Sequence, residues 1–212
     1  MAEPLPLTLW ATAMKTEGPA ITSAAKRLHQ QLTEAGQPVH LKLRWLDPLA
    51  CPDETGPQVA IMSMLTELGR RPEPQHVTLA RWRARIEQLQ DAGLPCMLCT
   101  VFRHVPDHVP GLPSEWAESI LRLNLTAVQL SQETGASVAD IDRALAEVGA
   151  RRLGTDFRIG QGWAASIAGH TIARTLLMEG LIDQLPADTL DSAVASLGTL
   201  RAFIKNHSPH NQ

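Results

Sequence analysis

The side chains that could carry out chemistry in this chain lie mainly in polar segments that follow apolar ones. The segment RHVPDHVPG (103–111) places His104, Asp107 and His108 close together, and imidazole and carboxylate groups are common metal ligands and general bases. A proline-bounded segment of this kind is also typical of solvated polar surface. His170 lies two to three turns into a predicted helix, which favours a packed or surface histidine. We take His104 and His108 as candidate catalytic bases, and we predict neither a bound metal nor a cofactor.

Arginines in similar segments could bind an anion. The candidates follow predicted strands or lie in a later loop: Arg70, Arg71, Arg103 and Arg158. Because a guanidinium pairs with carboxylate or phosphate through a fork of hydrogen bonds, a convergence of these residues would suit an anionic ligand. The alternative is that they are solvated and pair with Glu67, Glu73 and Asp107. The cluster RWRAR (81–85) is interpreted as the polar, surface side of a helix around Trp82.

The cysteines do not indicate a redox site. Cys96 and Cys99 form a CxxC pair, but the pair lies inside an apolar segment predicted to be a strand. Side chains at i and i+3 of a strand point to opposite faces, so we expect the two thiols to be buried and apart. Redox CxxC pairs instead lie at a helix start, which stabilises the thiolate. The odd total of three cysteines fits a reducing compartment.

Composition excludes several classes of function. Nineteen Lys and Arg residues against 22 Asp and Glu residues give a net charge of −3, whereas a nucleic-acid-binding protein usually has a basic excess. No stretch approaches the ~18 uninterrupted apolar residues of a membrane-spanning helix, and the amino terminus lacks the basic segment of a secretory signal. We therefore predict a soluble, cytoplasmic protein with no nucleic-acid partner and no membrane span.

The elements that must position these residues alternate along the chain. Apolar segments predict strands at 5–12, 39–45, 58–65, 94–102 and 136–142, and helical spacing predicts helices at 20–35, 76–92, 114–134, 142–148 and 160–178. Parallel strands joined through helices bury both faces of their sheet. The sequence therefore predicts an α/β fold, a three-layer α/β/α sandwich around a five-stranded parallel sheet, with the ligand-binding loops at the carboxyl ends of the strands. The alternating segment 39–45 is expected at a sheet edge.

The carboxy-terminal part is expected to differ in character. We predict one domain over residues 1–182 and a helical extension over 183–212. Apolar residues recur there at helical spacing: Leu190, Val194, Leu197, Leu200 and Ile204. This helix would either pack on the sheet as a further layer member or form a homodimer or partner contact.

The order of the segments resembles that of the SGNH, or GDSL-type, hydrolase superfamily over about residues 5–180. LTLWATAMKTEG is similar to the segment that carries the family's nucleophile, VAIMSMLTELGR to the segment that ends in its oxyanion-hole asparagine, and LGTDFRIGQGW to the last block with its Asp and His. The resemblance implies a flavodoxin-like α/β/α fold and hydrolysis of esters of lipids, sugars or other acyl groups.

Three of the four chemical groups of that family are missing here. Ala13 stands at the position of the nucleophilic serine, Thr66 and Glu67 at that of the asparagine, and Ile159 at that of the histidine base. Asp156 alone matches. An engineered Ser→Ala replacement would account for Ala13 but not for Glu67 or Ile159. The resemblance therefore implies a degenerate hydrolase that binds a ligand without the usual serine chemistry.

Two other functions stay open. The chain could be an active esterase, deacetylase or acyltransferase that uses Asp156 with His104 or His108, and with a displaced hydroxyl from Thr12, Thr16 or Ser63. It could also be an interaction protein that acts through its carboxy-terminal helix. For a small acyl or sugar ester we expect contacts from the rim residues Thr12, Ala13, Thr66, Glu67, Arg70, Arg103 and Arg158.

Overall fold

The computed structural model describes residues 3–47, 56–68, 70, 73–106 and 115–207. Within them, five parallel strands form one sheet in the order β2-β1-β3-β4-β5. The strands are β1 (Leu5–Thr12), β2 (Val39–Trp45), β3 (Gln58–Ser63), β4 (Cys96–Cys99) and β5 (Ser137–Ala139). The predicted five-stranded parallel α/β sheet is confirmed, and β2 lies at an edge as its alternating sequence indicated.

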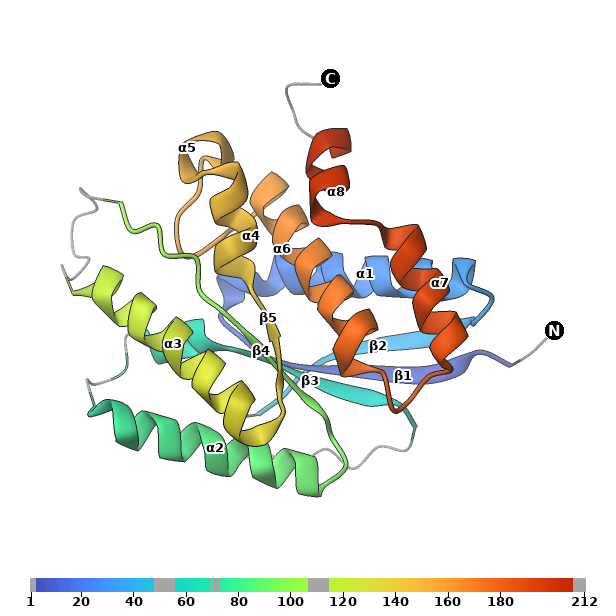
Figure 1. The fold of residues 1–212 in the computed structure, drawn as a ribbon, viewed down its shortest axis with the longest axis horizontal. Coiled ribbons are helices and arrows are strands. Elements are labelled where there is room, and N and C mark those ends of the chain that lie inside the picture. Colours follow the sequence, from blue (N-terminus) through green and yellow to red (C-terminus); the bar gives the residue numbers. More distant parts are fainter. Residues whose placement is uncertain (1–2, 48–55, 69, 71–72, 107–114, 208–212) are drawn as a thin grey trace.

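Helices cover both faces of the sheet (Figure 1). One face carries α1 (Gly18–Glu34), α4 (Ile141–Val148), the short α5 (Ala150–Leu153), α6 (Gly162–Thr175), α7 (Ala187–Leu197) and α8 (Leu200–His207). The other face carries α2 (Gln75–Asp91) and α3 (Trp116–Thr134). An apolar core lies on each side, so the predicted three-layer sandwich is also confirmed.

Three of the strands end earlier than the apolar segments suggested. β3 stops at Ser63 and continues as a 3₁₀ turn, η2 (Met64–Glu67), while β1 is followed by a similar turn, η1 (Lys15–Glu17). Residues beyond a strand can stay buried under neighbouring loops, and Val101 and Phe102 beyond β4 are both 2% exposed. A continuous apolar segment therefore marks burial more reliably than it marks strand ends.

The two cysteines of β4 lie on opposite sides of the sheet. Cys96 belongs to the core under α2 and α3, whereas Cys99 belongs to the core under α1 and α6, and both are free thiols. The expectation that they cannot pair is confirmed. Burial raises the pKa of Cys96 to about 12, which removes the thiolate that redox chemistry needs.

Helices α1 and α6 approach each other closely at Gly169. A Cβ atom at this position would lie 2.6 Å from Ser23 Cβ and 2.8 Å from the Ala20 carbonyl oxygen. Glycine is therefore required at this contact, which fixes α6 and the loop before it against the sheet.

The carboxy-terminal helical pattern is broken into two helices. The single continuous helix suggested by the spacing of Leu190 to Ile204 is wrong, because Gly198 adopts φ 74° and separates α7 from α8. After the π-turn η3 (Leu176–Gly180), the Gln184 side chain donates to the Gln58 carbonyl at 3.0 Å and accepts from the Gln58 N–H at 2.6 Å. Phe203 of α8 stacks on the buried His170 of α6 with a 4.6 Å centroid distance. Both helices thus contact the core of their own chain.

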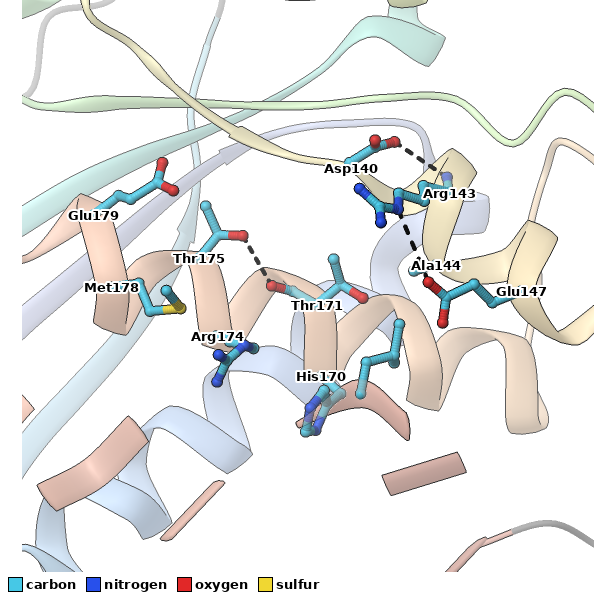
Figure 2. Close-up of a pocket in the computed structure, with 11 residues that line it drawn as sticks. Asp140, Arg143, Ala144, Glu147, His170, Thr171, Arg174, Thr175, Met178 and Glu179 are labelled. Carbon is cyan, nitrogen blue, oxygen red and sulfur yellow. Dashed lines mark hydrogen bonds and ion pairs between the residues drawn. The ribbon is translucent and has the colours of Figure 1, made fainter. Parts of the chain in front are cut away.

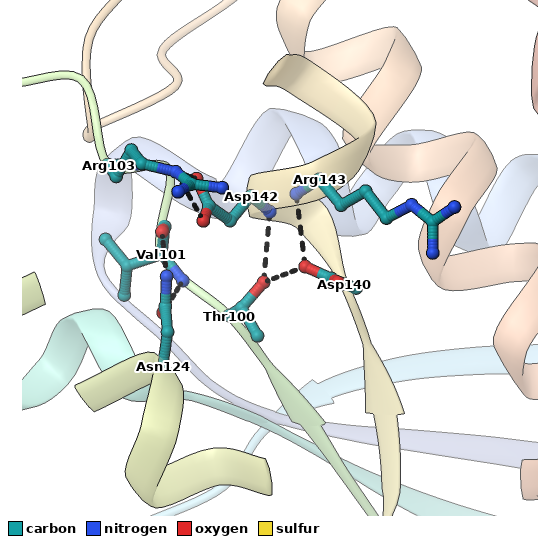
Figure 3. Close-up of polar contacts among 7 residues, drawn as sticks. All are labelled: Thr100, Val101, Arg103, Asn124, Asp140, Asp142 and Arg143. Carbon is teal, nitrogen blue, oxygen red and sulfur yellow. Dashed lines mark hydrogen bonds and ion pairs between the residues drawn. The ribbon is translucent and has the colours of Figure 1, made fainter. Parts of the chain in front are cut away.

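A side-chain amide fixes the segment that leaves β4. Asn124 of α3 donates to the Val101 carbonyl and accepts from the Val101 N–H, each at 2.8 Å (Figure 3). The Asn124 amide thus makes the two backbone hydrogen bonds that an adjacent strand would make with Val101.

In the described part of the chain, no helix is long and apolar enough to cross a membrane.

Candidate functional site

A cleft of about 840 Å³ opens at the carboxyl ends of β1, β2 and β3 and is bounded by α2. Its polar and charged lining residues are Thr12, Thr66, Glu67, Arg70, Arg81, Arg85 and Gln88, and its apolar ones are Ala11, Ala13, Trp45, Leu46, Met62, Trp82 and Ala84. Parallel strands of this kind of sheet present their loops at this edge, which is where ligands bind in open α/β folds. The structure thus brings together five predicted site residues: Thr12, Ala13, Thr66, Glu67 and Arg70.

The hydroxyl groups of the cleft donate to backbone carbonyls. Thr12 Oγ1 donates to the Leu46 carbonyl at 3.4 Å, and Thr66 Oγ1 donates to the Ser63 carbonyl at 2.8 Å. An attacking hydroxyl needs a base that accepts its proton, and a backbone carbonyl cannot do this. The arrangement orders the loops and does not activate a nucleophile.

Glu67 ends η2 and is held by arginine. Its side chain is 7% exposed, and its two carboxylate oxygens accept from Arg81 Nη1 and Nη2 at 3.0 and 2.7 Å. Burial alone would raise the pKa of Glu67, but the hydrogen bonds and charge of Arg81, with the charge of Arg70, lower it below its usual value. Glu67 is therefore an ionised carboxylate in the wall of the cleft, and the charge of Arg81 balances its own. It is not a donor for an oxyanion.

Glu17 ends η1, and its partners among the described residues are a hydroxyl and a backbone N–H and not a guanidinium. Ser63 Oγ donates to its Oε1 at 2.5 Å, the Met14 N–H donates to its Oε2 at 2.9 Å, and the carboxyl is 4% exposed. Burial raises the pKa of Glu17 to about 7, and the two hydrogen bonds offset only part of that rise. The Glu17–Ser63 pair ties the loop after β1 to the end of β3. Because both residues are buried, the pair supports the cleft and does not face a ligand.

A second pocket, of about 770 Å³, contains predicted residues from η1, from the segment after β4 and from the last loop. Thr16, His104, Asp156 and Arg158 all line it. Asp156 accepts the Arg158 N–H at 2.9 Å and also pairs with the Arg158 guanidinium. Partial burial acts to raise the pKa of Asp156, but Arg158 and the nearby His104 lower it overall. Asp156 is therefore an ionised carboxylate held mainly by its neighbour two residues along the chain.

Ile159 stands where the resemblance expects a histidine, and its backbone is left-handed at φ 61°. The side chain is 2% exposed and packs in the core beside α6. A β-branched residue in this conformation is sterically unfavourable, so burial of the side chain must offset the cost. A buried aliphatic group of this kind can neither accept nor deliver a proton.

The other predicted site residues lie elsewhere. Arg103 does not join Arg70. Instead, its Nε pairs with Asp142 Oδ2 at 3.0 Å, and its N–H donates to Asp142 Oδ1 (Figure 3). Arg71, Asp107 and His108 lie outside the described residues. Among the residues that are described, no group of three or more His, Cys, Asp or Glu side chains is placed to hold a metal ion.

A small pocket between α4 and α6 is polar, and its charges on α4 pair with one another. It measures about 200 Å³, and the Arg143 guanidinium in it pairs with Glu147 on the same helix at 3.8 Å (Figure 2). The Arg143 N–H donates to the Asp140 carboxylate at 3.1 Å, which caps α4. This pocket is far smaller than the cleft, and the charges of Asp140, Arg143 and Glu147 stabilise α4.

Sequence reasoning missed the cleft residues on α2 and β2. Trp45, Trp82, Arg81 and Arg85 line the cleft, and Trp82 is 5% exposed, so the apolar side chain within residues 81–85 is buried while Arg81 and Arg85 beside it face the cleft. A usable signal was present, because residues 81, 85 and 88 share one helix face. The Glu17–Ser63 pair gave no such signal, since its residues are 46 positions apart.

Solved structures with a similar fold include the three described next. A lipase/acylhydrolase from Enterococcus faecalis superposes with a TM-score of 0.56 at 13% identity, covering 86% of this chain and 99% of that one. A catalytic mutant of an acetylxylan esterase from Geobacillus stearothermophilus gives 0.55 at 11% identity, covering 84% and 95%. A candidate SGNH hydrolase from Slackia heliotrinireducens gives 0.52 at 13% identity, covering 82% and 100%. The chain has the SGNH hydrolase fold.

The similarity to these structures is one of fold, because the sequence identities are only 11 to 13%. No family model and no curated protein matches the sequence. The fold implied by the resemblance is confirmed. Within this SGNH hydrolase fold, Ala13 and Thr66 line one pocket and Asp156 lines another, and the two pockets share no described lining residue.

Proposed function

We propose that this chain is a ligand-binding member of the SGNH-type hydrolases that lacks serine-ester chemistry. The observation that carries the proposal is Ala13, a methyl group at the nucleophile position, which lines an open cleft of about 840 Å³. Ile159 at the base position and the arginine-paired Glu67 at the oxyanion position support the same conclusion. Loss of nucleophile, base and oxyanion donor together leaves binding as the main capacity of such a site.

The proposed ligand is a small molecule with an acyl group, from acyl or carbohydrate metabolism. The similar structures include an acetylxylan esterase and a lipase/acylhydrolase, and a cleft retained without catalytic groups would still fit such compounds. A cytoplasmic location remains a prediction. A homodimer through the carboxy-terminal helices also remains one, and Leu190 and Phe203, which could have faced a partner, are buried against their own chain.

Hydrolysis of short-chain p-nitrophenyl esters tests the proposal. The chain should release p-nitrophenol at the rate of a heat-inactivated control, and the His104→Ala and Asp156→Asn variants should match it. Turnover well above that background, lost in a rim variant, would overturn the non-catalytic reading.

The same assay tests the alternative of an enzyme with displaced residues. Its support is that Thr16, His104 and Asp156 line one pocket, so a hydroxyl, an imidazole and a carboxylate lie at a common surface. Under this alternative, Thr16→Ala and His104→Ala would each abolish turnover, while Thr12→Ala would leave it intact.

A further inference from the structure

The cleft carries more positive than negative charge. Among its described lining residues, Arg70, Arg81 and Arg85 are cationic and Glu67 is anionic. Because Arg81 already occupies both oxygens of Glu67, this carboxylate does not repel an incoming anion at close range. A neutral ester could accept a hydrogen bond from such a lining, whereas an anionic group would in addition be attracted by its charge.

Arg70 is the best-placed guanidinium to receive that anion. Its side chain is 52% exposed, and its Nε lies 3.6 Å from Glu67 Oε1, which is an ion-pair distance but too long for a hydrogen bond. Its fork of N–H donors can therefore turn to a carboxylate or phosphate while it keeps its charge contact with Glu67. Arg85 lines the same cleft and is oriented by Gln88 Oε1 at 2.8 Å.

The rest of the wall suits an apolar body. Trp45 at the end of β2 is 54% exposed although it lines the cleft, and Trp82, Leu46 and Met62 present buried apolar surface beside it. An exposed tryptophan next to a cavity offers a large flat face at small entropic cost to an acyl chain or an aromatic ring. The cleft thus combines one apolar wall with guanidinium groups.

We propose that the cleft binds a small organic anion, with its acyl or aryl body against Trp45 and Trp82 and its carboxylate or phosphate at Arg70. This inference rests on the proposed function and sharpens it, because it names a charged acid or phosphate ester as the ligand where a neutral ester would also have fitted.

Matched pairs of ligands test the charge requirement on the full chain. Butyrate, phenylacetate and phenyl phosphate are compared with methyl butyrate, methyl phenylacetate and phenol at up to about 10 mM, because fragments of this size bind weakly. Binding is followed by NMR through the tryptophan indole N–H signals. Those of Trp45 and Trp82 should move, whereas that of Trp163 on α6, outside the cleft, should not. At least one anion should bind about tenfold more tightly than its neutral counterpart.

Two arginine variants complete the test. Arg70→Gln should weaken the binding of the anion about tenfold and leave the neutral compound unchanged. Arg83→Gln is the matched control, because Arg83 lies on α2 but pairs with Glu133 of α3 and does not line the cleft. It should change neither affinity.

The outcomes separate this inference from the proposed function. Equal binding of acid and neutral compound at Trp45 and Trp82, unaffected by Arg70→Gln, overturns the anion requirement and leaves the proposed ligand-binding function standing. No shift of either indole signal with any compound counts against both. If Arg70→Gln and Arg83→Gln weaken the binding of the anion equally, the inference is also overturned. The effect would then come from the overall charge of the surface and not from Arg70.

Discussion

Two glutamates end the 3₁₀ turns after β1 and β3, and their surroundings give them opposite protonation behaviour. Glu17 accepts from a hydroxyl and a backbone N–H, and its pKa is raised to about 7. Glu67 accepts from a guanidinium, and its pKa is lowered. Both carboxyls are almost completely buried. The comparison shows that the partner, and not burial alone, decides whether a carboxyl at this edge carries charge.

The two glutamate pairs also differ in their position relative to the cleft. The Glu17–Ser63 pair lies below the cleft and joins two loops without presenting a charge to it. The Glu67–Arg81 pair forms part of the cleft wall and brings a guanidinium with it. Changes at the first pair should therefore alter stability with pH, while changes at the second should alter both stability and the ligand surface.

The largest expected effect is that of Glu17→Gln on stability at alkaline pH. A raised folded-state pKa means that the folded chain holds the proton more tightly, so this residue's contribution is full below pH 4.5 and is lost as pH rises to about 7. Glutamine can accept the Met14 N–H through its oxygen and donate to Ser63 Oγ through its amide nitrogen, so it keeps both contacts with the Ser63 hydrogen bond reversed, and it removes the titration. The free energy of unfolding, measured with urea, should be about 3 kcal/mol higher for the variant than for the natural chain at pH 8. Near pH 4.5 the two values should be equal. A flat pH profile for both chains would contradict the burial of an ionisable Glu17. The exposed Glu87→Gln is the control.

Arg81→Gln should have the next largest effect. It leaves the Glu67 carboxylate buried without its bidentate partner, and loss of such charge-assisted hydrogen bonds should cost about 2 kcal/mol at pH 7. The contribution of Glu67 to stability changes with pH in the opposite direction to that of Glu17. Because the folded pKa of Glu67 is lowered, its stabilisation is present above pH 4.5 and is lost as pH falls through the folded value.

Arg83→Gln is the matched control for this prediction. It removes an arginine of the same helix, but one whose partner Glu133 is on the surface, so the change in unfolding free energy should be much smaller. Equal losses in the two variants would mean that the buried position of Glu67 contributes nothing.

Ser63→Ala, which removes a partner of Glu17, should have a smaller effect on the free energy of unfolding. Removal of the hydroxyl that donates to Glu17 should cost about 1 kcal/mol. Because this hydrogen bond lowers the pKa of Glu17, the pH-dependent step in stability should also move to higher pH. Thr66→Val removes a hydroxyl of the same cleft loop that donates only to a carbonyl, so it should leave the step in place.

The smallest expected effect is that of Ala13→Ser on ester hydrolysis. A hydroxyl at this position would line the same cleft as Thr12, Thr66 and the Glu67–Arg81 pair, and none of these groups is a free base. Release of p-nitrophenol should stay at background between pH 6 and about 9. A gain of turnover on this single change would mean that a base of the second pocket reaches the cleft.

The sheet could be predicted from the sequence because its signals are local. The apolar segments 58–65 and 94–102 are buried over almost their whole length, and the basic alternation of 39–45 is typical of an edge strand. The break at Gly198 was missed because the spacing of Leu190 to Ile204 continues across it, while the turn depends on one backbone angle. Periodicity records which side chains are buried and not whether the helix is continuous.

The candidate site could be predicted only in part. The resemblance to the SGNH hydrolases singles out Ala13, Thr66 and Glu67, and the rule that ligands bind at strand ends points to the loops that carry them. The separation of Asp156 from Ala13 and the pairing of Arg103 with Asp142 could not be predicted, because both depend on how loops far apart in the sequence are oriented. The sequence predicts Trp45 only as the end of a strand, and its exposure beside the cleft depends on the tertiary structure.

The Gln184 side chain has a consequence for any shortened version of this protein. Its amide serves both backbone groups of Gln58, the first residue of β3, in the way that a strand neighbour would. A fragment that stops at residue 182 would expose an unpaired N–H and carbonyl at the start of a central strand, together with the faces of α1 and α6 that α7 and α8 cover. Such a fragment should aggregate through that opened edge, so expression trials should retain the chain through His207.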